Sequence, residues 1–148
     1  MIIPDVNLLI YAYDSSSPHH AAAAGWWQRC MTGKEEVGLA SVVAFGFVRL
    51  CTNPRIFQKP LTVAEASKRL ESWLARPQVR VIEPSPYHVS EVLALLQATG
   101  TAGNLTTDAQ IAALALQEKA ILHSNDTDFL RFPGIRCHNP LTGKNHSA

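Results

Sequence analysis

The sequence has few cysteines, and they are not arranged as a disulfide framework. Cys30, Cys51 and Cys137 are odd in number, far apart and free of any CxxC pair. This usage is typical of reduced thiols in a cytosolic protein, and it argues against a structural zinc site.

Long apolar runs are missing as well. No segment reaches the roughly 20 consecutive apolar residues of a membrane span, which argues against a transmembrane protein. The first residues, MIIPD, carry neither the basic region nor the apolar stretch of a secretory signal. We therefore expect a cytoplasmic protein. The absence of GxxxxGK[ST] and GxSxG motifs argues against nucleotide hydrolases and serine esterases.

The chain also lacks an excess of charge of either sign. Its 13 Lys and Arg and 12 Asp and Glu give a formal net charge of +1, so composition offers no global electrostatic argument for a nucleic-acid partner. The length of 148 residues and the apolar share of 47% indicate one globular domain. We expect that domain at residues 1–141 and a flexible polar tail at 142–148.

Segments typical of strands and helices alternate along the chain. Strands are expected at 2–3, 37–39, 79–82, 120–123 and 135–137. Helices are expected from about 8, at 18–31, at 41–51, from the Thr62 cap to near 77, after the Ser85 cap, and from 106 or 107 to about 119. This alternation predicts an α/β fold, in which a parallel sheet of about four to five strands is flanked by helices on both faces.

Acidic residues follow two of the expected strands. Asp5 comes directly after the first strand, and Asp126 and Asp128 come after the strand at 120–123. Asp108 lies in the first turn of the last long helix. Because ligands of open α/β sheets collect beyond the carboxyl ends of the strands, we expect the four carboxylates to converge.

Such a convergence predicts a metal site. Neighbouring carboxylates repel one another unless a cation neutralises them, and oxygen ligands suit Mg²⁺ or Mn²⁺. An ion of this kind can activate a water for attack on a phosphodiester and stabilise the leaving oxygen. Hydrolysis of nucleic acid is therefore the leading chemical interpretation.

Each aspartate, taken singly, also has a structural interpretation. Asp108 could simply complement the helix dipole, and Asp126 could cap the short turn after it. Asp5 could form an Asx-turn with the following helix, and Asp128 could be a solvated surface charge. The four positions together therefore carry more weight than any one of them.

Three ordered motifs extend the pattern over nearly the whole chain. They are DVNLLIYAYD near the start, RLCTNPRIF in the middle and GNLTTDAQIAALAL...ILHSNDTDFLRFPGI near the end. Together they resemble the PIN-domain ribonucleases, most closely the VapC toxins of bacterial toxin–antitoxin pairs. The resemblance runs from Ile3 to about Leu141. It implies a metal-dependent endoribonuclease that cleaves structured RNA such as transfer or ribosomal RNA, forms a homodimer and is neutralised by a small cognate antitoxin.

The resemblance also implies the roles of the acidic residues. Asp5, Asp108 and Asp126 match the family's catalytic, metal-binding acids, and Asp128 matches an accessory acid that many members carry. One position departs from the pattern, because Gly46 stands where the family usually places a glutamate. A weakened or inactive relative that binds RNA or antitoxin, and a metal-dependent phosphatase, are the alternatives.

Other polar residues in these motifs are candidates for positioning the substrate. Arg49 and Arg55 could meet phosphates, or could be ordinary solvated surface. Asn7, Thr52 and Asn53 could position a water or a phosphate, and Asn7 could instead cap a helix.

Two further features leave alternatives open. His123, at the end of the strand before Asp126, could be a general base or a structural histidine. Trp73 could be a core residue or, with Leu74, part of a dimer contact.

Overall fold

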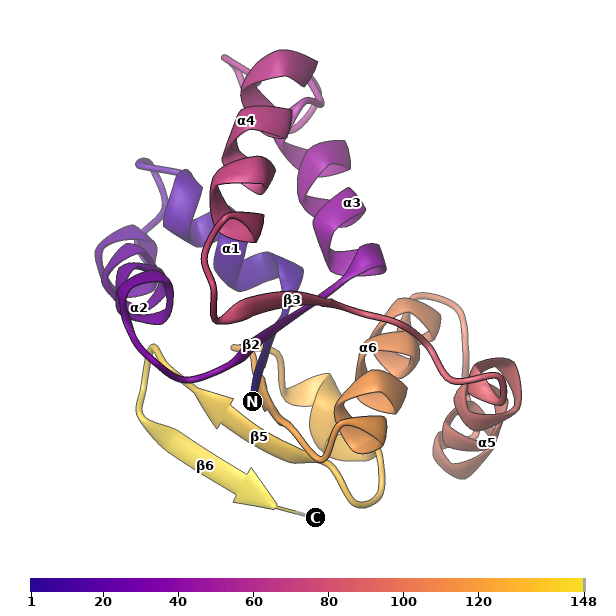
Figure 1. The fold of residues 1–148 in the computed structure, drawn as a ribbon. Coiled ribbons are helices and arrows are strands. Elements are labelled where there is room, and N and C mark those ends of the chain that lie inside the picture. The colour runs from indigo at the N-terminus through magenta and orange to yellow at the C-terminus, as the bar shows by residue number, and fades with distance from the viewer. Residues whose placement is uncertain (148) are drawn as a thin grey trace.

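The fold is organised around one sheet with β1 near its centre. The computed structural model describes residues 1–147, and its six-stranded sheet has the order β3-β2-β1-β4-β5-β6 (Figure 1). The strands are β1 (Ile2–Pro4), β2 (Val37–Ala40), β3 (Val79–Ile82), β4 (Ile121–His123), β5 (Arg136–Asn139) and β6 (Lys144–Ser147). β1 to β5 run parallel, and β6 runs antiparallel to β5.

Helices make the connections between the parallel strands. They are α1 (Val6–Tyr13), α2 (His20–Thr32), α3 (Ser41–Cys51), α4 (Val63–Leu74), α5 (His88–Thr99), α6 (Leu105–Gln117) and a 3₁₀ helix, η1 (Thr127–Arg131). Figure 1 shows α1 to α4 together on one side of the sheet and α5 with α6 on the other. The crossovers from β1 to β2 and from β2 to β3 run one way across the sheet, and the crossover from β3 to β4 runs back the other way. Because parallel crossovers are almost always right-handed, the two sets of helices cover opposite faces. The expected α/β fold with helices on both faces is confirmed.

The core contains the central strands and an aromatic cluster above them. Every residue of β1 and β2 is buried, as expected for strands covered on both faces. Trp73 on α4 packs against Trp27 and Phe47, with ring centroids 5.2 and 4.9 Å apart. Trp73 therefore belongs to the core of the monomer. Within residues 1–147, no helix is both long and apolar enough to cross a membrane.

The cysteines are structural. Cys30, Cys51 and Cys137 are all free and buried, which confirms the expectation of reduced thiols. Burial raises the pKa of Cys30 and Cys137 to about 11 and that of Cys51 to about 12. Thiols of this kind are unreactive near neutral pH.

The C-terminal segment differs from the flexible tail expected at 142–148. Residues 144–147 form β6, which pairs with β5 from Asn139↔Lys144 to Arg136↔Ser147, while residue 148 lies outside the described part. All four side chains of β6 are exposed, so backbone pairing rather than apolar burial holds the strand. Polar composition therefore did not reveal it. This strand also gives the sheet one strand more than the expected four to five.

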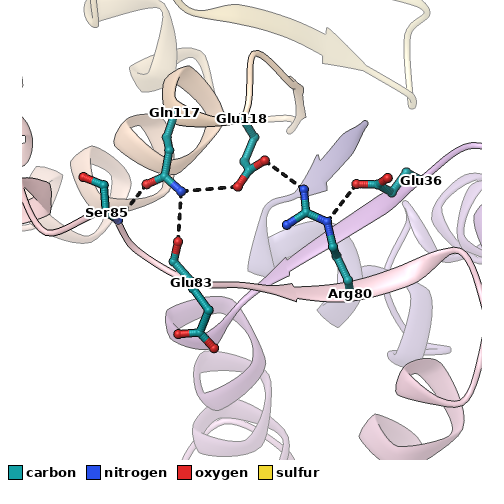
Figure 2. A network of polar contacts seen from close by, with 6 residues as sticks. All are labelled: Glu36, Arg80, Glu83, Ser85, Gln117 and Glu118. Carbon is teal, nitrogen blue, oxygen red and sulfur yellow. Dashed lines mark hydrogen bonds and ion pairs between the residues drawn. The ribbon is translucent and has the colours of Figure 1, made fainter.

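Polar side-chain contacts attach the C-terminal end of α6 to the neighbouring β3 region. The helix begins at Leu105, slightly earlier than expected. At its other end, Figure 2 shows Arg80 of β3 bound to Glu118 and Glu36, with N···O distances of 2.8 and 2.9 Å. Gln117 accepts a hydrogen bond from the backbone N–H of Ser85 (2.9 Å). These contacts tie the end of α6, the helix that carries Asp108 in its first turn, to the β3 region.

Candidate metal centre

The candidate site lies where the strand order reverses. The chain leaves the centre of the sheet toward β2 and β3 on one side and returns through β4 and β5 on the other. Ligands of open α/β sheets bind at such a switch point, beyond the carboxyl ends of the strands. Asp5 follows β1 here, and its backbone N–H donates to the carbonyl oxygen of His123 (2.9 Å), at the end of β4. The loops after β1 and β4 therefore start side by side.

Asp5 is buried even though it can carry a charge. Asp5 is only 2% exposed, and its Oδ2 accepts a hydrogen bond from Ser124 Oγ at 2.8 Å. Ser124 Oγ also accepts from the backbone N–H of Asp126 at 2.9 Å. One buried hydroxyl therefore links the two acids that end β1 and β4. Sequence reasoning missed Ser124, although its place in HSNDTD, directly after a strand and two residues before Asp126, was a usable signal.

Three further carboxylates converge beside Asp5. Asp108, Asp126 and Asp128 each offer a carboxylate oxygen, and these oxygens lie within 4.8 Å of one another. Asp126 Oδ1 also accepts from the backbone N–H of Asp128 (2.9 Å) and so caps η1. Asp126 therefore does both things expected of it: it caps the short helix after it, and it belongs to the carboxylate cluster. Asp5 lies outside this close group and is coupled to it through Ser124.

The electrostatics of the cluster favour a bound cation. Burial raises the pKa of Asp5 to about 6; the negative charge of Asp126 also raises it, while the hydrogen bond from Ser124 lowers it. Burial, and then the charges of Asp5, Asp126 and Asp128, raises the pKa of Asp108 to about 7. Both carboxyls therefore resist ionisation until positive charge is supplied. An all-oxygen donor set suits a hard divalent ion, so these residues fit such a metal.

Gly46 faces the same region from α3. A Cβ built on Gly46 would lie 3.3 Å from Val6 Cγ2, so a side chain there would point at the first turn of α1, next to Asp5. Placing glycine here leaves the α3 side without the carboxylate that the PIN-domain pattern usually supplies. The contact is tight but involves a side-chain methyl, which can shift.

The remaining candidates at the far end of α3 are not brought to the cluster. Thr52 Oγ1 donates to the carbonyl oxygen of Val48 (2.7 Å), and Asn53 Oδ1 accepts from the backbone N–H of Arg55 (2.9 Å). α3 has 11 residues and begins at the carboxyl edge of the sheet, so at 1.5 Å per residue these groups lie about 16 Å along it. Arg49 and Arg55 are exposed on this part of the surface.

Asn7 and His123 stand closer to the acids. Asn7 is exposed in the first turn of α1, two residues after Asp5. His123 Nδ1 accepts a hydrogen bond from Trp26 Nε1 at 3.0 Å, and burial lowers the His123 pKa to about 4. The hydrogen bond from Trp26 favours the structural interpretation of His123, which was the second of its two.

A family model described as PIN domain matches residues 2–135. The chain therefore belongs to the PIN domain family. It is 42% identical to ribonuclease VapC33 of Mycobacterium tuberculosis over 141 residues, which cover 95% of this chain and 99% of that protein.

Solved structures show the same fold. Mycobacterium tuberculosis VapC20, described as a Sarcin-Ricin loop cleaving toxin, superimposes with a TM-score of 0.65 at 16% identity, covering 88% of this chain and 93% of that one. A toxin-antitoxin complex from Klebsiella pneumoniae gives a TM-score of 0.63 at 18% identity, covering 95% and 98%.

The raised pKa values predict an unusual dependence of stability on pH. The folded carboxyls bind protons more tightly than the unfolded ones, whose pKa is 3.8. Their contribution to stability is therefore present below about pH 4 and is lost as the pH rises through about 6 to 7. We expect Asp108→Asn to stabilise the metal-free protein more at about pH 7.5 than at about pH 5. Thermal melts measure this; Glu71→Gln, at an exposed acid on α4, is the control. An equal effect of Asp108→Asn at both pH values would contradict the raised pKa of Asp108.

The orientation of Gly46 predicts that metal affinity can be increased. Gly46→Glu should tighten Mn²⁺ binding by about tenfold, of the order that groups around a metal contribute. Calorimetric titration of the folded variants measures it. Gly46→Gln has the same shape without the charge and should leave the affinity unchanged or slightly lower. Equal affinities for the two variants would mean that position 46 does not face the ion.

Proposed function

We propose that this protein is a Mg²⁺- or Mn²⁺-dependent endoribonuclease of the VapC type, a toxin that cleaves structured cellular RNA. The observation that carries the proposal is the convergence of Asp108, Asp126 and Asp128 beside buried Asp5 at the switch point of the sheet. The ribonuclease VapC33, similar over nearly its full length, supports the same activity. Such a toxin would act on RNA in the cytoplasm.

The chain's residues would divide the work as follows. Asp5, Asp108 and Asp126 would hold the ion, and Asp128, the most exposed of the four, would support it through a water. When bound, the ion activates a water and stabilises the leaving oxygen of the phosphodiester. Ser124 would keep Asp5 and Asp126 at a fixed separation through its two hydrogen bonds.

RNA would extend from the acids along α3. No acidic residue occurs between Glu36 and Glu65, so this stretch contributes only positive charge. We propose that Arg49 and Arg55 contact phosphates away from the scissile bond, where contacts position RNA without reading its sequence. Asn53, bound to the backbone of Arg55, would shape the turn that presents it, and Thr52 would stabilise that turn. Asn7 would orient a water or phosphate near Asp5.

The proposed substrate and partner follow the family. Transfer RNA and ribosomal RNA are the candidate substrates; VapC20 is described as cleaving the Sarcin-Ricin loop. A small cognate antitoxin would neutralise the protein, as the toxin-antitoxin complex from Klebsiella pneumoniae suggests by its similar fold.

Replacing the acids tests the activity. Asp5→Asn and Asp108→Asn should keep the fold but reduce RNA cleavage by about a hundredfold or more, because even groups that only support metal ligands are worth up to about that much. Glu71→Gln is the matched control and should cleave normally.

The assay uses purified protein and structured RNA, with and without chelator. Full activity of either aspartate variant would refute the site, and cleavage that survives chelation would refute the metal requirement. RNA binding without cleavage would favour the inactive relative that Gly46 suggests. Hydrolysis of a phosphomonoester instead of RNA would favour the phosphatase.

We also propose a homodimer that buries apolar surface of the middle helices. Phe45 on α3 and Val63 on α4 are each 71% exposed, and Leu74 at the end of α4 is 43% exposed. Trp73, which was part of the sequence argument, is used in the core instead.

Light scattering at high micromolar concentration measures the mass. We expect a dimer for the wild type and a shift toward monomer for Phe45→Ser, because the proposed contact loses a large and highly exposed apolar side chain. Leu93→Ser is the control, since Leu93 is 52% exposed on α5, away from the middle helices. A strictly monomeric wild type would contradict the proposal.

A further inference from the structure

The loop that carries Asp126 and Asp128 is held from the end of β5. Asn139, the last residue of β5, donates from Nδ2 to Asn125 Oδ1 at 2.8 Å. Asn125 lies directly before Asp126 in the loop that follows β4. A side chain of β5 is therefore hydrogen-bonded to the acidic loop that follows β4.

The orientation of the Asn139 amide is fixed by its surroundings. Its Oδ1 accepts from the backbone N–H of Leu141 at 2.9 Å, and its carbonyl oxygen accepts from the N–H of Gly143 at 2.8 Å. Since a backbone N–H can only donate, the amide oxygen must face Leu141 and the Nδ2 must face Asn125. Gly143, at φ +78°, closes the turn that leads into β6. The β5–β6 hairpin thus holds Asn139 in one position.

The Asn139–Asn125 hydrogen bond matters because the loop's own hydrogen bonds do not attach it to the rest of the protein. Asp126 is bonded through its N–H to Ser124 and through its Oδ1 to the N–H of Asp128. Those bonds are internal to the loop, so they fix its shape but not its position. Ser124 ties the start of the loop to Asp5 and Asn139 ties the next residue, Asn125, to β5. These two side-chain bonds hold the start of the loop from opposite sides. They act together with the backbone N–H of Ser124, which donates to the carbonyl oxygen of His138 (3.0 Å), and with the fully buried Phe129 of η1.

We propose that Asn139 is a positioning residue for the metal centre: it acts through Asn125 to hold Asp126 and Asp128 where both can serve one ion with Asp108. The inference rests on the proposed metal-dependent function. It assigns a role to the C-terminal hairpin, which lies at the end of the sheet away from β3 (Figure 1). Groups that orient metal ligands from behind typically contribute about 10- to 100-fold to metal affinity or activity.

A double-mutant cycle read out by Mn²⁺ calorimetry tests the role. Asn139→Ala and Asn125→Ala should each weaken Mn²⁺ binding by about tenfold, and the double variant should be no weaker than either single one, because both changes remove the same contact. Excess Mn²⁺ should return the rate of RNA cleavage toward that of the wild type.

Asn145→Ala is the matched control. It removes another Asn side chain from the same hairpin, one whose hydrogen bond goes to His138 Nδ1 (2.6 Å) and not to a residue of the acidic loop. The Mn²⁺ affinity of Asn145→Ala should stay within about twofold of the wild type, a much smaller change than the loss of about tenfold expected for Asn139→Ala.

Several results would overturn the proposal. Wild-type affinity in a folded Asn139→Ala variant would do so, and so would single effects that multiply in the double variant. Thermal melts report folding, and if Asn139→Ala does not fold, Asn125→Ala decides alone because it leaves the Leu141 contact intact. If the wild type itself binds no Mn²⁺, the metal function fails together with this role; unaffected variants of a wild type that does bind refute only the role.

Discussion

The parallel pairing of β1 with β4 is the constraint on which the whole site depends. Its register, from Ile2↔Ile121 to Pro4↔His123, ends both strands at the same level of the sheet. Asp5 and the loop from Ser124 onward therefore leave the sheet side by side, although they are more than a hundred residues apart in the chain. A shift of one residue in this register would turn the strand side chains to the opposite faces and offset the two loops by about 3.3 Å.

This arrangement concentrates negative charge that the fold alone does not neutralise. Burial and mutual repulsion raise the pKa of Asp5 to about 6 and of Asp108 to about 7. Stability is thus given up for a site that gains most from a divalent cation, a trade often found where function requires a strained arrangement. α3 adds no carboxylate to this repulsion, because Gly46, whose Cβ would face Val6, stands where the family usually has a glutamate.

The positions of the acids were predictable for a simple reason, and those of their supports were not. Asp5 directly follows an apolar strand, and Asp126 and Asp128 lie in the loop that follows another. The strand-end rule applies to such residues without knowledge of packing. Ser124 stands in the same stretch, but only the structure shows that its hydroxyl reaches Asp5 across the sheet. Thr52 and Asn53 shared a motif with Arg49, yet the length of α3 carries them away from the acids.

The sequence by itself determined the alternation of strands and helices, the buried central strands and the acids at the strand ends, because these follow from local periodicity and position. Tertiary structure alone decided the long-range contacts. β6 has no apolar face that a sequence pattern could reveal, and it forms by pairing with the free edge of β5. Trp73 lies in the core because its ring packs against Trp27 of α2 and Phe47 of α3. Asn139 reaches Asn125 because β4 and β5 are neighbours, and a pairing between distant segments leaves no local pattern in either of them.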